Sequence, residues 1–213
     1  MSNTADRRVK RTKRKIKLAL IELMNEKEFG AITVQDIAER ADINRGTFYL
    51  HYQDKYDLFE RSVDDMLEEL AKTVGPTENE RGNIARTYPE QQVIRLFSHF
   101  QHHSDFYKTM FGDNARTYFQ NRFMDMLFKQ FSQAFEELKL TPRAMNGINK
   151  EIVTHYVLFA HLGVLVNWLE QDTPHSPEYM AKQLESIYEY AYQFTRPEEE
   201  RLTRANRHGT DSR

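Results

Sequence analysis

The stretch from Ile32 to Leu58 constrains the fold most strongly, because it carries three helix starts in close succession. Thr33 is a good N-cap, and Asp36 lies three residues further on, where it can complete a capping box. Asn44 and Asp54 are N-cap residues of the same kind. Starts this close together leave room only for short helices and tight turns. We therefore predict two short helices joined by a tight turn, with a third helix beginning directly after them.

The second short helix, about residues 44–51, has an inner and an outer side. Phe48 joins apolar residues such as Ile37 in a small core, so its neighbours Thr47 and Tyr49 are free to point outward. A helix-turn-helix motif presents side chains to the major groove of DNA in this way. The residues that we predict to contact DNA are Thr33, Asn44, Arg45, Gly46, Thr47, Tyr49, His51, Tyr52 and Lys55.

Two of these residues have the chemistry to read bases. Arg45 can donate two hydrogen bonds to guanine O6 and N7. Thr47 can bond a base or a phosphate through its hydroxyl and touch thymine with its methyl group. Gly46 has no side chain, so the helix can approach DNA closely. We therefore expect Arg45 to matter for sequence choice.

The remaining polar residues suit contacts to phosphates. Tyr49, His51 and Tyr52 can donate hydrogen bonds that fix orientation and carry no sequence code. Lys55 lies in the first turn of the next helix, where a cation opposes the helix dipole, and a phosphate partner would explain it. Thr33 can offer its backbone N–H at a helix start. The alternative is that the two tyrosines and the histidine pack the underside of the motif.

The amino-terminal segment is strongly basic. Residues 1–17 hold eight cations and one carboxylate, a net charge of +7, although the whole chain has a net charge of −2. This charge asymmetry indicates that the amino-terminal end of the protein binds nucleic acid and that the other end does not. We expect residues 1–8 to be a disordered basic arm and a helix to begin at about Val9. A tail that merely improves solubility is the alternative.

The residues of this stretch resemble the DNA-binding motif of TetR-type transcriptional regulators. The resemblance implies a three-helix helix-turn-helix domain, a carboxy-terminal helical domain for ligand binding and dimerisation, and a repressor released by a small-molecule effector. Asp42 departs from the pattern, because the family usually has glycine in that turn. A left-handed backbone there is tolerated better by Asp than by most residues. The matching residues are Thr33, Ile37, Ala38, Ala41, Arg45, Gly46, Thr47, Phe48, Tyr49, His51, Tyr52, Lys55 and Leu58.

Residues 88–195 carry a second resemblance, whose motifs are less specific. The segments HSDFYKTMFGDN and LGVLVNWLEQDTPHSPEYMA are similar to a TetR subgroup from Gram-positive bacteria. Together the two resemblances cover most of the chain. The predicted fold is all-α. Its predicted parts are a disordered basic arm (1–8), the helix-turn-helix domain (9–55), a connecting helix (56–74), a loop (75–89), a regulatory and dimerisation domain (90–195) and a disordered tail (196–213).

Two predicted helices, at about 147–171 and 177–195, are more apolar than ordinary surface helices. The first is apolar on nearly every side, so it needs burial over most of its circumference. Two such helices meeting their copies would form a four-helix interface, although both could instead fill the core of one chain. The resemblance favours a homodimer through these last two long helices. A dimer also suits a palindromic double-stranded operator.

Aromatic residues of the carboxy-terminal half can line an apolar cavity for a small hydrophobic effector. A packed aromatic core is the alternative, because buried aromatic rings usually just pack. The family habit of binding small ligands favours the cavity, and we expect no resident cofactor. The predicted pocket residues are Phe97, Phe100, Phe106, Tyr107, Met110, Phe123, Leu127, Phe131 and Trp168.

A metal ion, a protein partner and a role as activator are the alternatives for regulation. His99 and His103 share a helix face, with His102 and Asp105 nearby, and can ligate one zinc ion. His155 and His161 lie on another helix but do not share a face. Histidines at this spacing are more often surface residues, so we predict no metal site.

Composition and motifs exclude several classes of protein. The chain has no cysteine, so it has no disulfide and no thiolate metal ligand. It has no nucleophile elbow, zinc-protease, P-loop or dinucleotide-binding motif, so we predict that it is not an enzyme. The apolar run from Tyr156 to Leu169 is broken by His161 and Asn167 and is short for a membrane span. We expect a cytoplasmic protein without a membrane partner.

Overall fold

A computed structural model describes residues 2–75, 90–113, 115–137 and 149–195. All regular elements within these ranges are helices, which confirms the all-α prediction. Residues 76–89 of the predicted loop at 75–89 lie outside the described residues, as does the predicted tail at 196–213. The elements are α1 (Ser2–Glu26), the 3₁₀ turn η1 (Phe29–Ala31), α2 (Val34–Arg40), α3 (Arg45–Tyr49), α4 (Lys55–Val74), α5 (Glu90–His102), α6 (Ser104–Phe111), α7 (Arg116–Glu137), α8 (Lys150–Glu170) and α9 (Pro177–Thr195).

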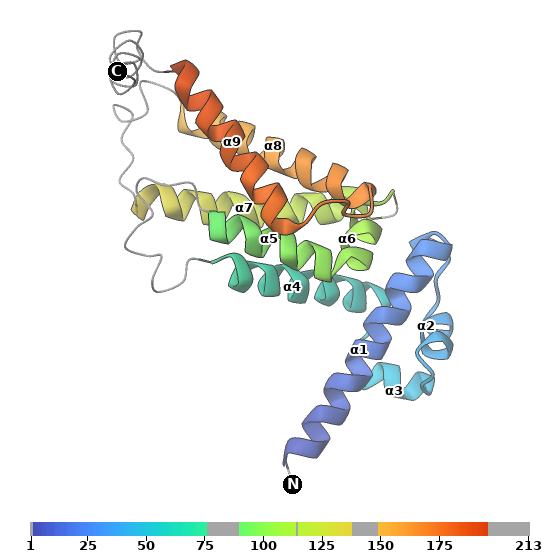
Figure 1. The fold of residues 1–213 in the computed structure, drawn as a ribbon. Coiled ribbons are helices and arrows are strands. Elements are labelled where there is room, and N and C mark those ends of the chain that lie inside the picture. Colours follow the sequence, from blue (N-terminus) through green and yellow to red (C-terminus); the bar gives the residue numbers. More distant parts are fainter. Residues whose placement is uncertain (1, 76–89, 114, 138–148, 196–213) are drawn as a thin grey trace, which may run out of the picture.

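The helices divide into two regions joined by α4. Helices α1, α2 and α3 form one end of the molecule, and α5 to α9 form a bundle at the other (Figure 1). Helix α4 begins beside α3 and runs into this bundle, where it packs on α5 and α7. The α3 end and the bundle are therefore linked by one continuous rod.

The three predicted N-caps are confirmed. The Thr33 hydroxyl accepts the Asp36 N–H at 3.1 Å, and the Asp36 carboxylate accepts the Thr33 N–H at 2.8 Å, which completes the capping box. The Asn44 side chain accepts the Gly46 N–H at 2.7 Å. The Asp54 carboxylate accepts the N–H groups of Tyr56 and Asp57, the second and third residues of α4. Side chains within three residues of each start thus fix where α2, α3 and α4 begin.

The turn between α2 and α3 has the left-handed backbone that we expected at Asp42, with φ of 53°. The Asp42 N–H bonds the Glu39 carbonyl at 3.1 Å, and the Ile43 N–H bonds the Ala38 carbonyl at 3.0 Å. This pair of bonds is a Schellman motif, which satisfies the last carbonyls of α2. The departure from glycine is therefore compatible with a regular helix-turn-helix.

The predicted disordered arm at residues 1–8 is wrong, because α1 is helical from Ser2. Lys and Arg are good helix formers, so a basic segment can be helical as readily as disordered. Lys10 and Asp6 form an ion pair at 2.9 Å with the favourable spacing of four residues. The Thr12 hydroxyl donates to the Arg8 carbonyl at 3.0 Å. The basic residues therefore project from a helix.

The bundle core is aromatic. Phe100 stacks on Tyr107 with ring centroids 3.8 Å apart, and Trp168 meets Phe97 edge-on at 5.0 Å. Helix α8 passes through this core. By length and composition alone, it is the one helix in the described ranges that can cross a membrane; 33% of its most apolar stretch is buried. Core helices of soluble proteins also meet these criteria.

Candidate functional site

Helix α3 presents a polar outer side at the end of the molecule. Phe48 is fully buried and anchors the helix, as predicted. Asn44, Arg45 and Gly46 are exposed, and 47% of the Tyr49 surface is exposed. The start of α3 therefore offers an arginine and open backbone to a binding partner.

Arg45 and Tyr49 lie one helical turn apart and contact each other. An Arg45 Nη atom donates to the Tyr49 hydroxyl at 3.1 Å, and the guanidinium lies 5.5 Å from the centre of the ring. This contact uses one of the five guanidinium N–H donors. Arg45 therefore keeps donors for a base edge while Tyr49 limits its motion.

Tyr52 does not have the exposure that a phosphate contact requires. Only 3% of its surface is exposed, and its ring packs 5.8 Å from that of Phe48. Burial, the largest cause, raises the pKa of its hydroxyl to about 12. Tyr52 thus packs the underside of the motif, which was the alternative role. His51 is half-buried, and Thr33 is exposed at the start of α2.

The structure gives Lys55 a different role from the predicted phosphate contact. Its ammonium donates three hydrogen bonds, of 2.7 to 2.9 Å, to backbone carbonyls of the η1 segment. An ammonium has three donors, so these bonds use all of them. The carbonyls belong to Phe29, Gly30 and Ile32, and we call this arrangement the Lys55 clamp. It neutralises the end of η1 and explains a cation in the first turn of α4.

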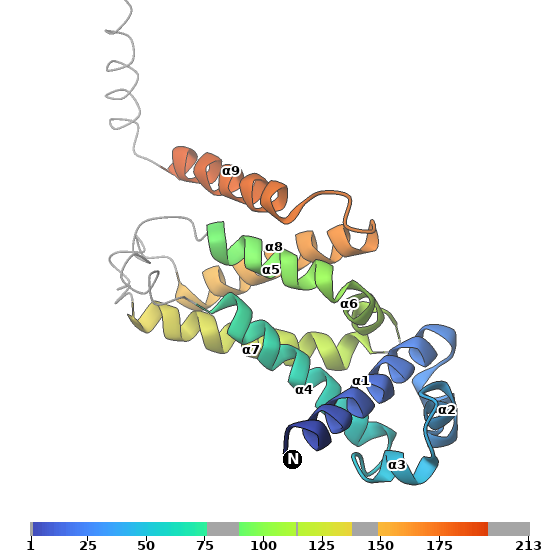
Figure 2. The same ribbon diagram turned by 60° about the horizontal axis from the view of Figure 1, so that its bottom comes forward.

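The basic part of α1 lies at the same end of the molecule as α3 (Figures 1 and 2). Lys15 lies 3.6 Å from Asp42 in the turn before α3, and Lys17 binds Asp65 of α4 at 2.5 Å. The other α1 cations are exposed and form no ion pair with a described residue except for Lys10, so they add positive potential beside α3. They are Arg7, Arg8, Arg11, Lys13 and Arg14.

A cavity of about 590 Å³ lies within the bundle, between α5, α7, α8 and α9 and the end of α4. Its volume is in the range of about 300–1,000 Å³ that is common for small-molecule sites. Three predicted pocket residues, Phe97, Phe123 and Leu127, line it. The other lining residues are Val74, Gln92, Val93, Leu96, Gln130, Val157, Leu158, His161, Leu162, Leu165 and Tyr188.

Five predicted pocket residues instead belong to the packed core. Their rings and side chains are buried against one another, as in the Phe100–Tyr107 stack, and do not line the cavity. They are Phe100, Phe106, Tyr107, Met110 and Trp168. The side chain of Phe131 lies outside those that the structure describes. Sequence patterns place aromatic residues inside the bundle but do not separate packing rings from rings beside a void.

The cavity is also lined by polar groups, and the sequence did not predict that they lie together. The His161 Nδ1 atom bonds the Val157 carbonyl at 2.6 Å, so it carries the proton. The Nε2 atom of the same ring lies 3.0 Å from the Tyr188 hydroxyl, within hydrogen-bond distance. Gln92 and Gln130 face the same space. The site therefore suits an apolar molecule with a polar end.

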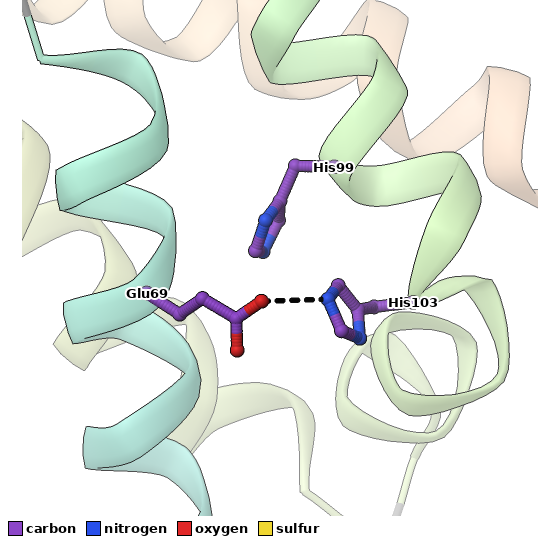
Figure 3. Close-up of side chains that lie close together, drawn as sticks. All are labelled: Glu69, His99 and His103. Carbon is purple, nitrogen blue, oxygen red and sulfur yellow. Dashed lines mark hydrogen bonds and ion pairs between the residues drawn. The ribbon is translucent and has the colours of Figure 1, made fainter.

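A separate cluster of side chains joins α4 to the α5–α6 junction (Figure 3). Glu69, His99 and His103 each offer a ligand atom, and these atoms all lie within 4.8 Å of one another. The predicted pairing of His99 with His103 is therefore present, and Glu69 was missed because it lies on another helix. His102 and Asp105 lie outside the cluster.

The predicted His155 and His161 are also not part of this cluster. His155 bonds the Glu151 carbonyl at 2.9 Å within its own helix. His161 faces the cavity.

Comparisons with known proteins agree with this architecture. Residues 18–61 match the family model of bacterial regulatory proteins of the tetR family. Residues 87–190 match the model of a transcriptional regulator C-terminal region. The chain is 28% identical over 169 residues to the uncharacterized HTH-type transcriptional regulator YxbF of Bacillus subtilis. That match covers 79% of this chain and 42% of YxbF, so the chain spans less than half the length of that relative.

Solved structures share the fold. A TetR transcriptional regulator from Streptococcus agalactiae is 24% identical, with a TM-score of 0.53, over 88% of this chain and 98% of its own. The regulator FadR from Bacillus subtilis, solved in complex with stearoyl-CoA, is 13% identical, with a TM-score of 0.54. That match covers 82% of this chain and 96% of FadR. Both comparisons place an amino-terminal motif and a helical bundle in the same order.

Proposed function

The chain belongs to the TetR family of DNA-binding transcriptional regulators, and from this premise we propose that it is a cytoplasmic repressor released by a small apolar effector. The observation that carries the proposal is the exposed outer side of α3, with Arg45 at its start and the basic half of α1 beside it. Arg45 would read a guanine, and Thr47, which is half-buried, would contact a base or a phosphate. Cations of α1 would hold the duplex through its phosphates.

The carboxy-terminal helices support a homodimer. Helix α8 exposes 67% of Ile152, 73% of Tyr156 and 48% of Phe159. Helix α9 exposes 59% of Ile187 and 64% of Tyr190. Apolar side chains exposed along two long helices favour an interface with a second copy. Such a dimer would present two copies of α3 to a palindromic operator.

The cavity supports an effector with an apolar chain and a polar end. Similar structures include the fatty acid degradation regulator FadR from Bacillus halodurans and the stearoyl-CoA complex of FadR from Bacillus subtilis. We propose that the chain of the effector packs on Val157 and Leu158, and that its polar end meets His161 and Tyr188. Helix α4 would carry the signal, because Val74 at its end lines the cavity and Lys55 at its start follows α3. A shift of α4 would change the spacing of the two α3 helices.

Selection of bound fragments from the source genome tests the regulator function. The full chain should enrich a small set of sites with two-fold sequence symmetry, and binding should weaken as salt rises. Enrichment no better than that of bulk genomic fragments would refute the proposal. Transcription from a promoter that carries the selected site should fall when the protein is present.

A separate titration with saturated fatty acids of increasing length tests the effector. We expect release from the selected DNA by one range of chain lengths. Val157→Trp should fill the cavity and weaken release by about tenfold, with DNA binding retained. Ser98→Trp adds the same ring at an exposed position of α5 and is the control. Equal loss in both variants would argue against binding in the cavity.

A further inference from the structure

We propose that Glu69, His99 and His103 form a binding site for a divalent transition-metal ion, best matched by Zn²⁺, at the junction of α4 with α5 and α6. Two imidazoles and one carboxylate are a common set of protein ligands for zinc. All three residues come from different turns or helices and converge on one point (Figure 3). The site is distinct from the cavity, because none of the three lines it.

The distances are close to those of a bound ion. Ligand atoms in a tetrahedral zinc site, at about 2.0–2.2 Å from the metal, are roughly 3.3–3.6 Å apart. The Glu69 carboxylate and His103 Nε2 are 3.1 Å apart, and the three ligand atoms fit within 4.8 Å. Side-chain rotation alone can close the remaining gap, since Glu69 is 56% exposed on a flexible stem. A water molecule can occupy the fourth position on this open side.

The surroundings of His99 are those of an oriented metal ligand. His99 is 5% exposed, and its Nε2 atom lies 2.9 Å from the hydroxyl of the fully buried Tyr107. Histidine ligands of metals characteristically make a second hydrogen bond of this kind, which fixes the ring.

The position of the cluster gives the ion a mechanical role. Glu69 lies on α4, whereas His99 lies on α5 and His103 caps the start of α6. Helix α4 is also the rod that begins at the DNA-binding end. An ion that joins these three elements would hold α4 against the bundle. Without the ion, the Glu69–His103 pair is partly exposed and contributes little to this attachment. This regulatory step rests on the proposed function, but binding of the ion does not.

A zinc titration of the chelator-treated full chain, in the absence of DNA, tests the site by calorimetry. We expect one Zn²⁺ per chain and a melting temperature that rises with zinc concentration. Co²⁺ should give the visible absorption of a tetrahedral site. Glu69→Gln should weaken binding by at least about 100-fold and abolish that absorption. Tyr107→Phe should weaken it by about 10–100-fold, since it removes the group that orients His99.

His102→Asn is the matched control, because His102 is exposed on the same turn and lies outside the cluster. Its zinc affinity should equal that of the unmodified chain. Absence of stoichiometric binding, or equal losses in His102→Asn and Glu69→Gln, would overturn the site. Glu69→Gln changes a partly exposed residue, so without metal the variant should melt at the same temperature as the unmodified chain. That result would exclude misfolding as the cause of lost zinc binding.

A second measurement tests the regulatory step on DNA selected from the genome. Zinc should change DNA affinity at least threefold in the original chain and leave Glu69→Gln unchanged. Stoichiometric zinc binding without this change would overturn regulation by the ion. Failure to select any DNA would refute the proposed function while the zinc titration still decides the site.

Discussion

The two ends of α4 differ in how their structure is specified. At the α3 end, caps within three residues of each helix start set the boundaries, and Phe48 anchors α3 in the hydrophobic core that continues into the bundle. In the bundle, rings from distant helices meet, as Phe97 of α5 does with Trp168 of α8, and a cavity remains between them. The proposed DNA-reading surface must keep one geometry, whereas the proposed effector-binding region must be able to change. Local capping suits the first task and long-range packing around a void suits the second.

The largest expected effect is on dimer formation, which should depend on the bundle helix α8 and not on the α3 end. Phe159→Glu places a charge on the exposed apolar side of α8 and should raise the dissociation constant of the dimer by more than about 100-fold, because interfaces exclude unpaired charge. Analytical ultracentrifugation at micromolar concentration measures it. Leu50→Glu is the control, since Leu50 is 80% exposed at the end of α3. The comparison fails if both variants, or neither, become monomeric.

The next effect concerns DNA affinity. Arg45→Ala should cost about 1–3 kcal/mol of binding to the selected site and relax preference at one base pair in each half-site. Fluorescence anisotropy on a set of single-base variants measures both. Lys129→Ala removes an exposed cation of α7 and should leave preference unchanged. Uniform weakening on every sequence would instead make Arg45 a phosphate contact.

Loss of the Lys55 clamp should act on stability. Lys55→Met removes three hydrogen bonds to carbonyls, and we expect the free energy of unfolding to fall by about 2 kcal/mol. Urea denaturation measures this loss, with Lys72→Met as the control, because Lys72 pairs with the exposed Glu68 on the surface of the same helix. An unchanged stability with a smaller salt dependence of DNA binding would restore the phosphate role of Lys55.

The smallest effect is the pH dependence of the α2 capping box. The hydrogen bond from Lys27 is the largest cause that lowers the Asp36 pKa from 3.8 to about 2. Because the folded value is the lower one, Asp36 contributes stability above pH 4 and loses it as pH falls toward 2. The melting temperatures of the original chain and Asp36→Asn should differ at pH 6 and converge at pH 2. A difference in melting temperature that stays the same from pH 6 to pH 2 would show that other carboxylates cause the pH dependence of stability.

The same contrast explains what the sequence could predict. Thr33, Asn44 and Asp54 mark their helix starts because a cap acts over a few residues. The left-handed turn at Asp42 was expected from the resemblance, because the family usually has glycine there. The three carbonyl partners of Lys55 were not predicted because they belong to the η1 segment, more than twenty residues earlier in the chain. The burial of Tyr52 against Phe48 was weighed only as an alternative, because spacing alone does not decide which side of the motif a tyrosine faces. Glu69 was missed since only the packing of α4 on α5 brings it to His99. Residues that lie beside a void, such as Val157, carry no local signature at all.

The exposed apolar side of α8 has a consequence for the life of the protein in a cell. A lone chain would display Ile152, Tyr156 and Phe159 to chaperones and proteases, which act on exposed apolar segments. Pairing would hide them, so scarce copies would be degraded faster than abundant ones. The concentration of dimer would then rise more steeply than the rate of synthesis. A low basal level of expression would therefore have no effect on the target genes.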